Sequence, residues 1–187
     1  MKKILLPVYR KSEKHSSLPY YILFDIGKRL EFTSKRKAED FARSLNVYLS
    51  DSVRTLMLVQ RELYAIYLDY YFELESISSL RLQKKLDGFL SDLEYFHKEY
   101  GEGNNSFKMG GYWRILNHVE ETLDLSLTLF KEKNNYTIVN KLRSHKQMVS
   151  FSYDKINQSI TSHVINDDYK KTKFKVLTTK TTFYQSL

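Results

Sequence analysis

Apolar residues recur at alternating spacings of three and four along residues 51–161, which is the period of an amphipathic helix. Two polar stretches interrupt this pattern: the glycine-rich segment 101–111 and the pair Asn134 and Asn135. The pattern therefore predicts four helices, over residues 51–76, 78–100, 112–133 and 136–161. Because short connections join consecutive helices, we expect them to form an antiparallel four-helix bundle.

The first of these helices carries two apolar sets of residues. Its main stripe includes one polar member and comprises Val53, Leu56, Gln60, Leu63, Tyr67, Tyr70 and Leu74. A second set lies on another face and comprises Leu58, Ala65, Leu68 and Phe72. A helix that is apolar on two faces is either central in a bundle or half buried in a partner, and both interpretations remain open here.

The first 49 residues predict a small sheet followed by a helix. Alternating apolar and β-branched or aromatic residues predict strands over residues 2–9, 18–25 and 28–33. Pro7 confines the first strand to a sheet edge, and Gly27 supplies the turn between the other two. Ser34 then caps a helix whose apolar stripe is Ala38, Phe41, Ala42 and Leu45. This unit is a β-hairpin or a three-stranded sheet with one helix.

Residues 162–187 are basic and rich in threonine, and their apolar residues have no helical period. We expect an extended arm or a late strand in this region. The predicted fold class is therefore mainly α: an antiparallel four-helix bundle with a small N-terminal sheet plus helix and an extended C-terminal arm. The expected domains are residues 1–49, 50–161 and 162–187.

The composition excludes several classes of protein. The chain has 187 residues and no cysteine, so disulfides and thiolate metal sites are excluded. The opening segment MKKILLPVYRK has too short an apolar run for a signal peptide, and no stretch approaches the roughly 20 apolar residues that span a bilayer. We therefore expect a soluble, cytoplasmic protein without a membrane partner.

The basic charge is concentrated at the two ends of the chain. The net charge is +8, of which residues 1–50 contribute +6 and residues 151–187 contribute +3, whereas residues 51–100 contribute −3. A basic end can contact phosphate, bind an acidic protein, or keep the protein soluble. Of these three interpretations, contact with phosphate is the one that the uneven distribution of charge favours.

No motif in the sequence predicts catalysis or a cofactor. Glu94 and His97 have the spacing of metal ligands on a helix, but Leu93 and Phe96 form the apolar stripe there, which turns Glu94 away from the core. The segment 101–111 lacks the Gly-Lys-Ser/Thr ending of a phosphate-binding loop, and there is no Gly-x-Ser-x-Gly motif. We expect a protein that is not an enzyme and that holds no metal.

The predicted hairpin and the helix after it combine aromatic, basic and small residues in one pattern. The pattern consists of Tyr20, Tyr21, Phe24, Gly27, Lys28, Arg29, Phe32, Ser34, Ala38, Glu39, Phe41 and Ala42. It resembles AP2-like domains and the arm-binding domains of phage-type integrases, and the resemblance covers residues 2–46. The resemblance implies a sheet that lies in the DNA major groove with a helix packed behind it.

Two hypotheses of function follow, and neither involves catalysis. The first is a nucleic-acid-associated accessory protein, of a phage or a mobile element, that contacts the phosphates of DNA or RNA through Tyr20, Tyr21, Lys28, Arg29, Lys35, Arg36 and Lys37. The alternative is a structural or assembly protein, such as a phage virion connector or adaptor, located in the virion. It would bind a protein partner or itself through Tyr67, Tyr71, Phe174, Val176 and Phe183. The charge asymmetry favours the first hypothesis.

Overall fold

The computed structural model of the chain describes residues 6–12, 16–25, 28–101 and 109–166. Three strands precede four long helices, and a short 3-10 turn, η1, follows the first helix. The elements are β1 (Tyr9–Arg10), β2 (Tyr20–Asp25), β3 (Lys28–Phe32), α1 (Lys35–Asp69), η1 (Tyr71–Glu73), α2 (Ser76–Gly101), α3 (Met109–Glu132) and α4 (Tyr136–Asn166). The predicted combination of a helical bundle with a small N-terminal sheet is confirmed.

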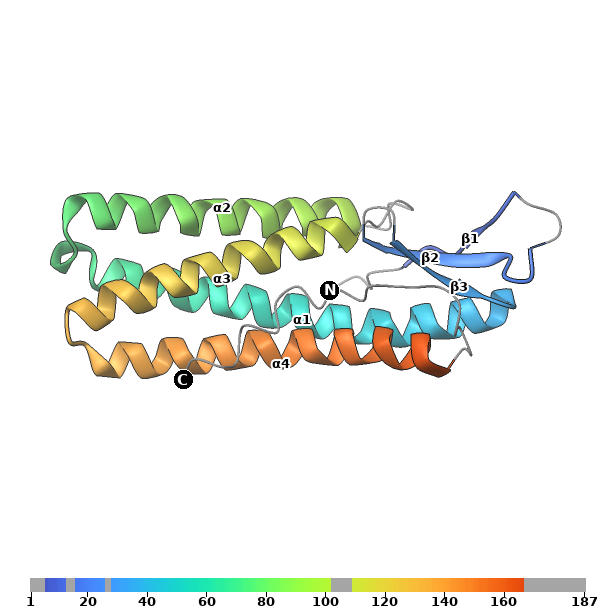
Figure 1. The fold of residues 1–187 in the computed structure, drawn as a ribbon. Coiled ribbons are helices and arrows are strands. Elements are labelled where there is room, and N and C mark those ends of the chain that lie inside the picture. The colour runs from blue at the N-terminus through green and yellow to red at the C-terminus, as the bar shows by residue number, and fades with distance from the viewer. Residues whose placement is uncertain (1–5, 13–15, 26–27, 102–108, 167–187) are drawn as a thin grey trace.

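The four helices run antiparallel along one long axis (Figure 1). Each helix packs against the next one in the sequence, and α4 packs against α1 to close the bundle. Asn134 makes the sharp connection between α3 and α4 possible, because it adopts a left-handed conformation with φ 55°. The side chain of Asn135 then accepts a hydrogen bond from the backbone N–H of Ile138 (3.2 Å) and so caps α4.

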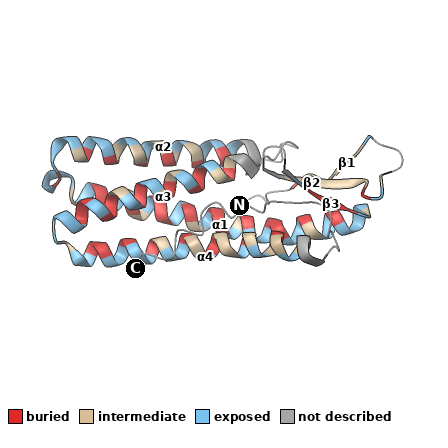
Figure 2. Ribbon diagram, viewed as in Figure 1, coloured by how far each residue is buried: buried red, intermediate tan, exposed pale blue. Residues whose placement is uncertain are grey.

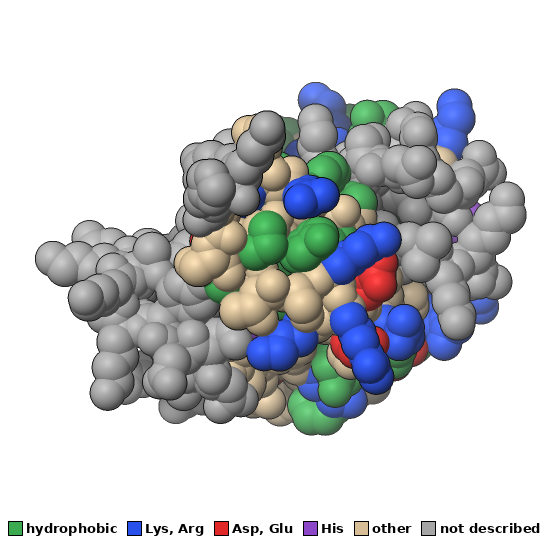
Figure 3. Space-filling view, turned by 90° about the vertical axis from the view of Figure 1, so that its right-hand side faces the viewer, with side chains coloured by type: hydrophobic (Ala, Val, Ile, Leu, Met, Phe, Trp, Pro, Cys, Tyr) green, Lys and Arg blue, Asp and Glu red, His purple; other side chains and the backbone are tan. Residues whose placement is uncertain are grey.

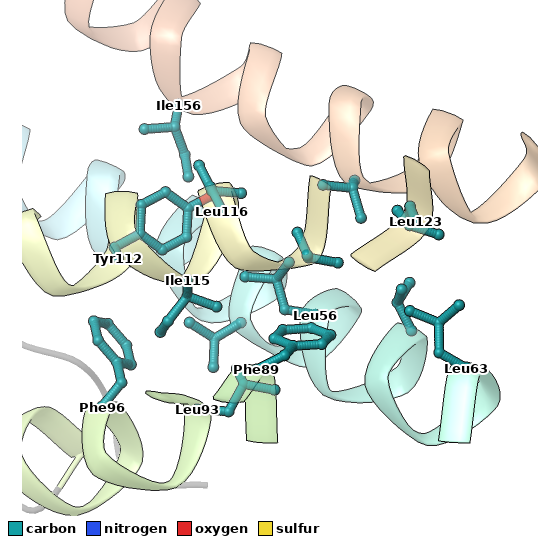
Figure 4. Packing of buried hydrophobic residues seen from close by; sticks show 14 of the residues in the cluster. Leu56, Leu63, Phe89, Leu93, Phe96, Tyr112, Ile115, Leu116, Leu123 and Ile156 are labelled. Atoms are coloured by element: carbon teal, nitrogen blue, oxygen red, sulfur yellow. The ribbon is translucent and has the colours of Figure 1, made fainter. Parts of the chain in front are cut away.

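Buried residues form continuous stripes along all four helices (Figure 2). The apolar stripes that the sequence predicts lie in one core cluster, and Figure 4 shows side chains from the four helices converging there. Over the described residues, no helix is both long enough and apolar enough to cross a membrane.

Helix α1 is longer than the sequence pattern predicted. It continues without a break from Lys35 to Asp69, through the region where two separate helices were expected. This range contains neither glycine nor proline, so nothing in the backbone interrupts the helix. The sheet and the bundle therefore share one helix across the expected boundary at residue 49. At its far end α1 stops before residue 76, and η1 makes the turn instead.

The first strand lies later in the chain than predicted. Residues 6–8 are not in a strand, and the edge strand is Tyr9–Arg10, which pairs antiparallel with Tyr21 and Tyr20 of β2. Pro7 has no N–H for a ladder, and the buried N–H of Leu6 donates to the side chain of Asn46 at 3.1 Å. Leu6 is therefore tied to α1 and not to the sheet.

Two other predicted boundaries also shift. Helix α3 begins at Met109, within the segment that we expected to be a loop. Helix α4 ends at Asn166, so the first five residues of the expected C-terminal arm are helical. The rest of the arm, residues 167–187, lies outside the described residues.

The sheet packs on the part of the bundle that α2 and α3 do not cover. Helices α1 and α4 extend beyond the ends of α2 and α3, and the sheet lies over this extension (Figure 1). Ile22, Leu30 and Phe32 on its inner face are buried with Ala38 and Ala42 of α1. The hydrophobic core therefore continues from the bundle under the sheet.

A chain of hydroxyl groups connects three helices inside the core. The hydroxyl of Tyr112 lies 2.6 Å from Oγ of Ser52, which donates to Oγ of Ser152 (3.1 Å). Ser152 in turn donates to the backbone carbonyl of Val149 (2.8 Å), so Tyr112 is the donor at the head of the chain. Burial raises the pKa of Tyr112 well above its ordinary value, which keeps this hydroxyl protonated.

His145 of α4 is buried, and neither ring nitrogen has a hydrogen-bond partner among the described residues. The charged groups that act on it are Glu62 of α1 and Lys141 of α4, which form an ion pair of 2.7 Å. Burial lowers the pKa of His145 below its ordinary value of 6.5, whereas Glu62 acts weakly in the opposite direction. The folded protein therefore holds His145 neutral.

The free energy of unfolding is expected to fall as the pH drops below 6.5, because the unfolded chain then binds a proton at His145 that the folded protein does not. Above that pH the imidazole is neutral in both states and contributes no dependence. Urea unfolding at pH 7.5 and pH 5.5 measures the difference. The His145→Leu variant should reduce it, whereas His97→Gln, at an exposed site, should not. An equal pH dependence in wild type and His145→Leu would contradict the assignment.

Candidate nucleic-acid interface

The alternation of side chains along β2 and β3 gives the sheet one buried face and one outer face. Tyr21 pairs with Tyr9 on one side and with Glu31 on the other, so these three residues share the outer face. The rings of Tyr9 and Tyr21 stack with centroids 5.3 Å apart and planes inclined by 23°. Burial and the neighbouring Tyr21 raise the pKa of Tyr9, so its hydroxyl remains protonated.

One carboxylate lies between two cations on this outer face. Glu31 forms ion pairs with Lys11 (2.9 Å) and with Arg29 (2.7 Å). The guanidinium carbon of Arg29 also lies 5.4 Å from the centre of the Tyr21 ring, which is within range of a cation–π contact. Lys11 is largely covered, whereas about half of the Arg29 side chain is exposed. Arg29 is therefore the cation that a ligand can reach.

The start of α1 carries three consecutive cations, Lys35, Arg36 and Lys37, all of them exposed. Ser34 caps the helix by accepting a hydrogen bond from the backbone N–H of Lys37 (3.3 Å). The helix dipole disfavours cations at this end, and the first turn contains no acidic residue. Lys35 and Arg36 reach carboxylates one turn later, whereas Lys37 forms no ion pair with any described residue.

These elements give the sheet end a basic character. Between residues 6 and 43 the described side chains include seven Lys and Arg but only three Asp and Glu. Figure 3 looks onto this end, where Lys and Arg side chains surround a small apolar area. Three carboxylates cannot neutralise seven cations, so this surface keeps a net positive charge and attracts anions.

The structure separates the residues that the sequence grouped together. Tyr21 and Arg29 lie together on the outer face, whereas Tyr20, which was grouped with them, pairs with Phe32, is half-buried and packs against the core. The side chain of Lys28 lies outside what the structure describes. Sequence reasoning missed Tyr9, Lys11 and Glu31, since the first strand was placed too early to bring them opposite Tyr21.

The residues predicted for a protein interface also have different environments. Tyr67 is only 3% exposed, and its hydroxyl donates to the side chain of Gln83 (3.3 Å), so it is not available at the surface. Tyr71 is exposed in η1, at the end of the bundle opposite the sheet (Figure 1). Phe174, Val176 and Phe183 lie outside the described residues.

Other candidate chemistry is dispersed. Glu94 and His97 are exposed on α2, and the described residues contain no group of three carboxylates or histidines that could hold a metal ion. Asp92 instead lies 2.8 Å from Nδ1 of His118 and accepts a hydrogen bond from Arg114, which connects α2 to α3. These contacts connect two neighbouring helices of the bundle.

Comparisons with protein-family models, with curated proteins and with solved structures found no match for this chain. The resemblance of residues 2–46 to AP2-like and integrase arm-binding domains therefore remains a prediction. A function for the chain has to be argued from the geometry of its own residues.

Proposed function

We propose that the protein is a nucleic-acid-associated accessory protein that binds DNA or RNA at its sheet end without catalysis. The observation that carries the proposal is the combination of Arg29 with the stacked Tyr9 and Tyr21 on the outer face of the sheet. Cations bind phosphate, and aromatic rings on an open sheet face can stack on bases. The three cations at the start of α1 add charge close to the same sheet in the sequence.

Glu31 limits this binding in the free protein. Its carboxylate forms ion pairs with both Lys11 and Arg29, so a phosphate has to compete with it for Arg29. About half of the Arg29 side chain is exposed, and an ion pair at an exposed surface is weak, on the order of 1 kcal/mol or less, so a polyanion can replace the contact between Arg29 and Glu31. Glu31 therefore tunes the affinity of the sheet face and does not prevent binding.

The double variant Arg29→Glu, Lys35→Glu is expected to bind duplex DNA and RNA about tenfold more weakly or worse, because each change replaces an attractive charge by a repulsive one. The dependence of log Kd on log salt concentration should also flatten by roughly one unit for each phosphate that the variant no longer binds. A fluorescence anisotropy titration of labelled duplex DNA and of RNA at several salt concentrations measures both quantities.

Two matched variants make this result specific. Arg81→Glu, Lys84→Glu changes the net charge equally on exposed positions of α2 and should leave binding unaltered apart from a small long-range effect. Glu31→Gln should act in the opposite direction and tighten binding. Equal binding by wild type and the Arg29→Glu, Lys35→Glu variant would rule out this surface as the site.

A role in assembly is the second candidate function, and one observation favours it. The turn between α1 and α2 exposes large apolar side chains at the end opposite the sheet. Exposed apolar clusters of this kind are typical of protein–protein contacts. Such a contact is compatible with nucleic-acid binding, because the two surfaces lie at opposite ends of the molecule (Figure 1).

A further inference from the structure

Five apolar side chains are exposed at the turn between α1 and α2, and we call this group the tip: Leu68, Tyr71, Phe72, Ile77 and Leu80. Phe72 is 95% exposed and Ile77 is 85% exposed. The rings of Tyr71 and Phe72 contact each other edge to face with centroids 5.2 Å apart, so the aromatic part of the tip is a defined surface. Exposure of such large side chains is unfavourable in water unless a partner covers them.

The segment that carries the tip is also acidic, whereas Lys131 and Lys133 are exposed on the neighbouring turn, next to Phe130, whose ring contacts that of Tyr70. Asp69, Glu73 and Glu75 are exposed around the tip, and there is no Lys or Arg between residues 62 and 80. None of these three carboxylates forms an ion pair with another described residue. The surface therefore fits a partner segment that presents lysines next to apolar side chains.

The chain itself contains such a segment in residues 167–187. This segment has five lysines and two aspartates, and Lys173 and Lys175 alternate with Phe174 and Val176. It follows α4, whose last residue, Asn166, lies at the sheet end, opposite the tip (Figure 1). Its chemistry is complementary to the tip in both charge and apolar character.

The distance along α4 decides which tip Phe174 and Val176 can reach. The 31 residues of α4 span about 46 Å. Val176 follows Asn166 by ten residues, which reach at most about 36 Å when fully extended. Phe174 and Val176 therefore cannot reach the tip of their own chain, although they can reach the tip of a second copy.

We infer that Phe174 and Val176 of one copy dock on the tip of the next, so that the protein associates head to tail. This contact goes beyond the nucleic-acid role and rests on the second candidate function, to which it gives a partner. The two contacting surfaces are different, so one copy can bind two neighbours, and association can continue into rings or filaments.

Mixing two full-length variants tests the inference. The tip variant is Phe72→Asp, Ile77→Asp, and the tail variant is Phe174→Asp, Val176→Asp. Sedimentation velocity over a wide range of concentration should give concentration-dependent oligomers for wild type and monomers for either variant alone. An equimolar mixture of the variants should form dimers and nothing larger, because only one intact tip and one intact tail are available. High salt should weaken both kinds of complex.

Three results would overturn the inference. The first is a wild-type monomer at every concentration. The second is self-association of either variant alone, since a tail variant that still associates would indicate tip-to-tip contact. The third is a mixture that remains monomeric although wild type associates, which would assign assembly to another surface and leave the second candidate function standing. The nucleic-acid proposal is tested by other residues, and both variants should bind DNA and RNA as monomeric wild type does.

Discussion

Replacing Phe89 with alanine is expected to lower the free energy of unfolding by about 3–5 kcal/mol, the usual range for a buried phenylalanine. Phe89 lies on α2 and is completely buried. Its ring points into the interior, where side chains of α1 and α3 also converge (Figure 4). Helices α1 and α3 pack against α2 here, so the backbone cannot collapse fully into the space that the ring leaves, and the packing defect remains.

Urea unfolding followed by circular dichroism measures this effect, and Phe72→Ala is a matched control. The control removes the same atoms from a position that is 95% exposed, so the free energy of unfolding should change little. Comparable decreases for the two variants would contradict the described core. An unchanged free energy of unfolding would also show that Phe72, a residue of the tip, does not contribute to stability, which is what we expect of a residue that serves binding.

Replacing Phe32 with alanine is expected to loosen the sheet end before the bundle. The buried ring of Phe32 contacts the rings of Phe41 on α1 and His163 on α4, with centroids 5.5 Å and 4.4 Å apart. A destabilisation of about 3 kcal/mol at this junction should accelerate amide exchange in β2 and β3 by about a hundredfold. Amides of α3 should keep most of their protection, because the rings that Phe32 contacts belong to α1 and α4 and not to α3.

Hydrogen exchange read by mass spectrometry separates the two regions directly. Uniform acceleration across the strands and all four helices would mean that sheet and bundle open as one unit, contrary to this expectation. The same variant should weaken nucleic-acid binding, since Tyr21 and Arg29 depend on the sheet for their positions. Phe89→Ala should give the opposite pattern, because it should accelerate amide exchange most strongly in α2 and α3.

The helical part of the fold could be predicted because burial imposes a simple period on it. Leu82, Leu86, Phe89 and Leu93 recur at helical spacing, and all four are buried in α2. The extent of α1 was missed although its buried stripe crosses the expected boundary without a break, since Leu45, Leu49, Val53 and Leu56 recur at helical spacing.

The sheet end was harder to predict from sequence because its strands are short. Tyr20 and Tyr21 are chemically identical, and only the register opposite Phe32 and Glu31 decides which ring faces the core. A first strand of two residues gives no pattern at all. The contribution of Glu31 to the charge balance depends on that same register, so the sequence predicted the cations and missed the carboxylate between them.

The second apolar set of α1 shows what periodicity cannot decide. Leu58, Leu68 and Phe72 were compatible with a central helix or with a partner, and all three are exposed in the isolated chain. The central-helix interpretation is therefore wrong for this face. A sequence states that a side chain is apolar, whereas the identity of the surface that covers it depends on the other chains present.

The uninterrupted course of α1 has a mechanical consequence. Its 35 residues make a rod of about 52 Å that begins under the sheet and ends at the turn into α2. A tension applied between the two ends would load this single helix along its axis, without a hinge to absorb it. The molecule would then act as a rigid spacer. Any partners bound at its two ends would be held apart by a distance that the number of helical turns in α1 fixes.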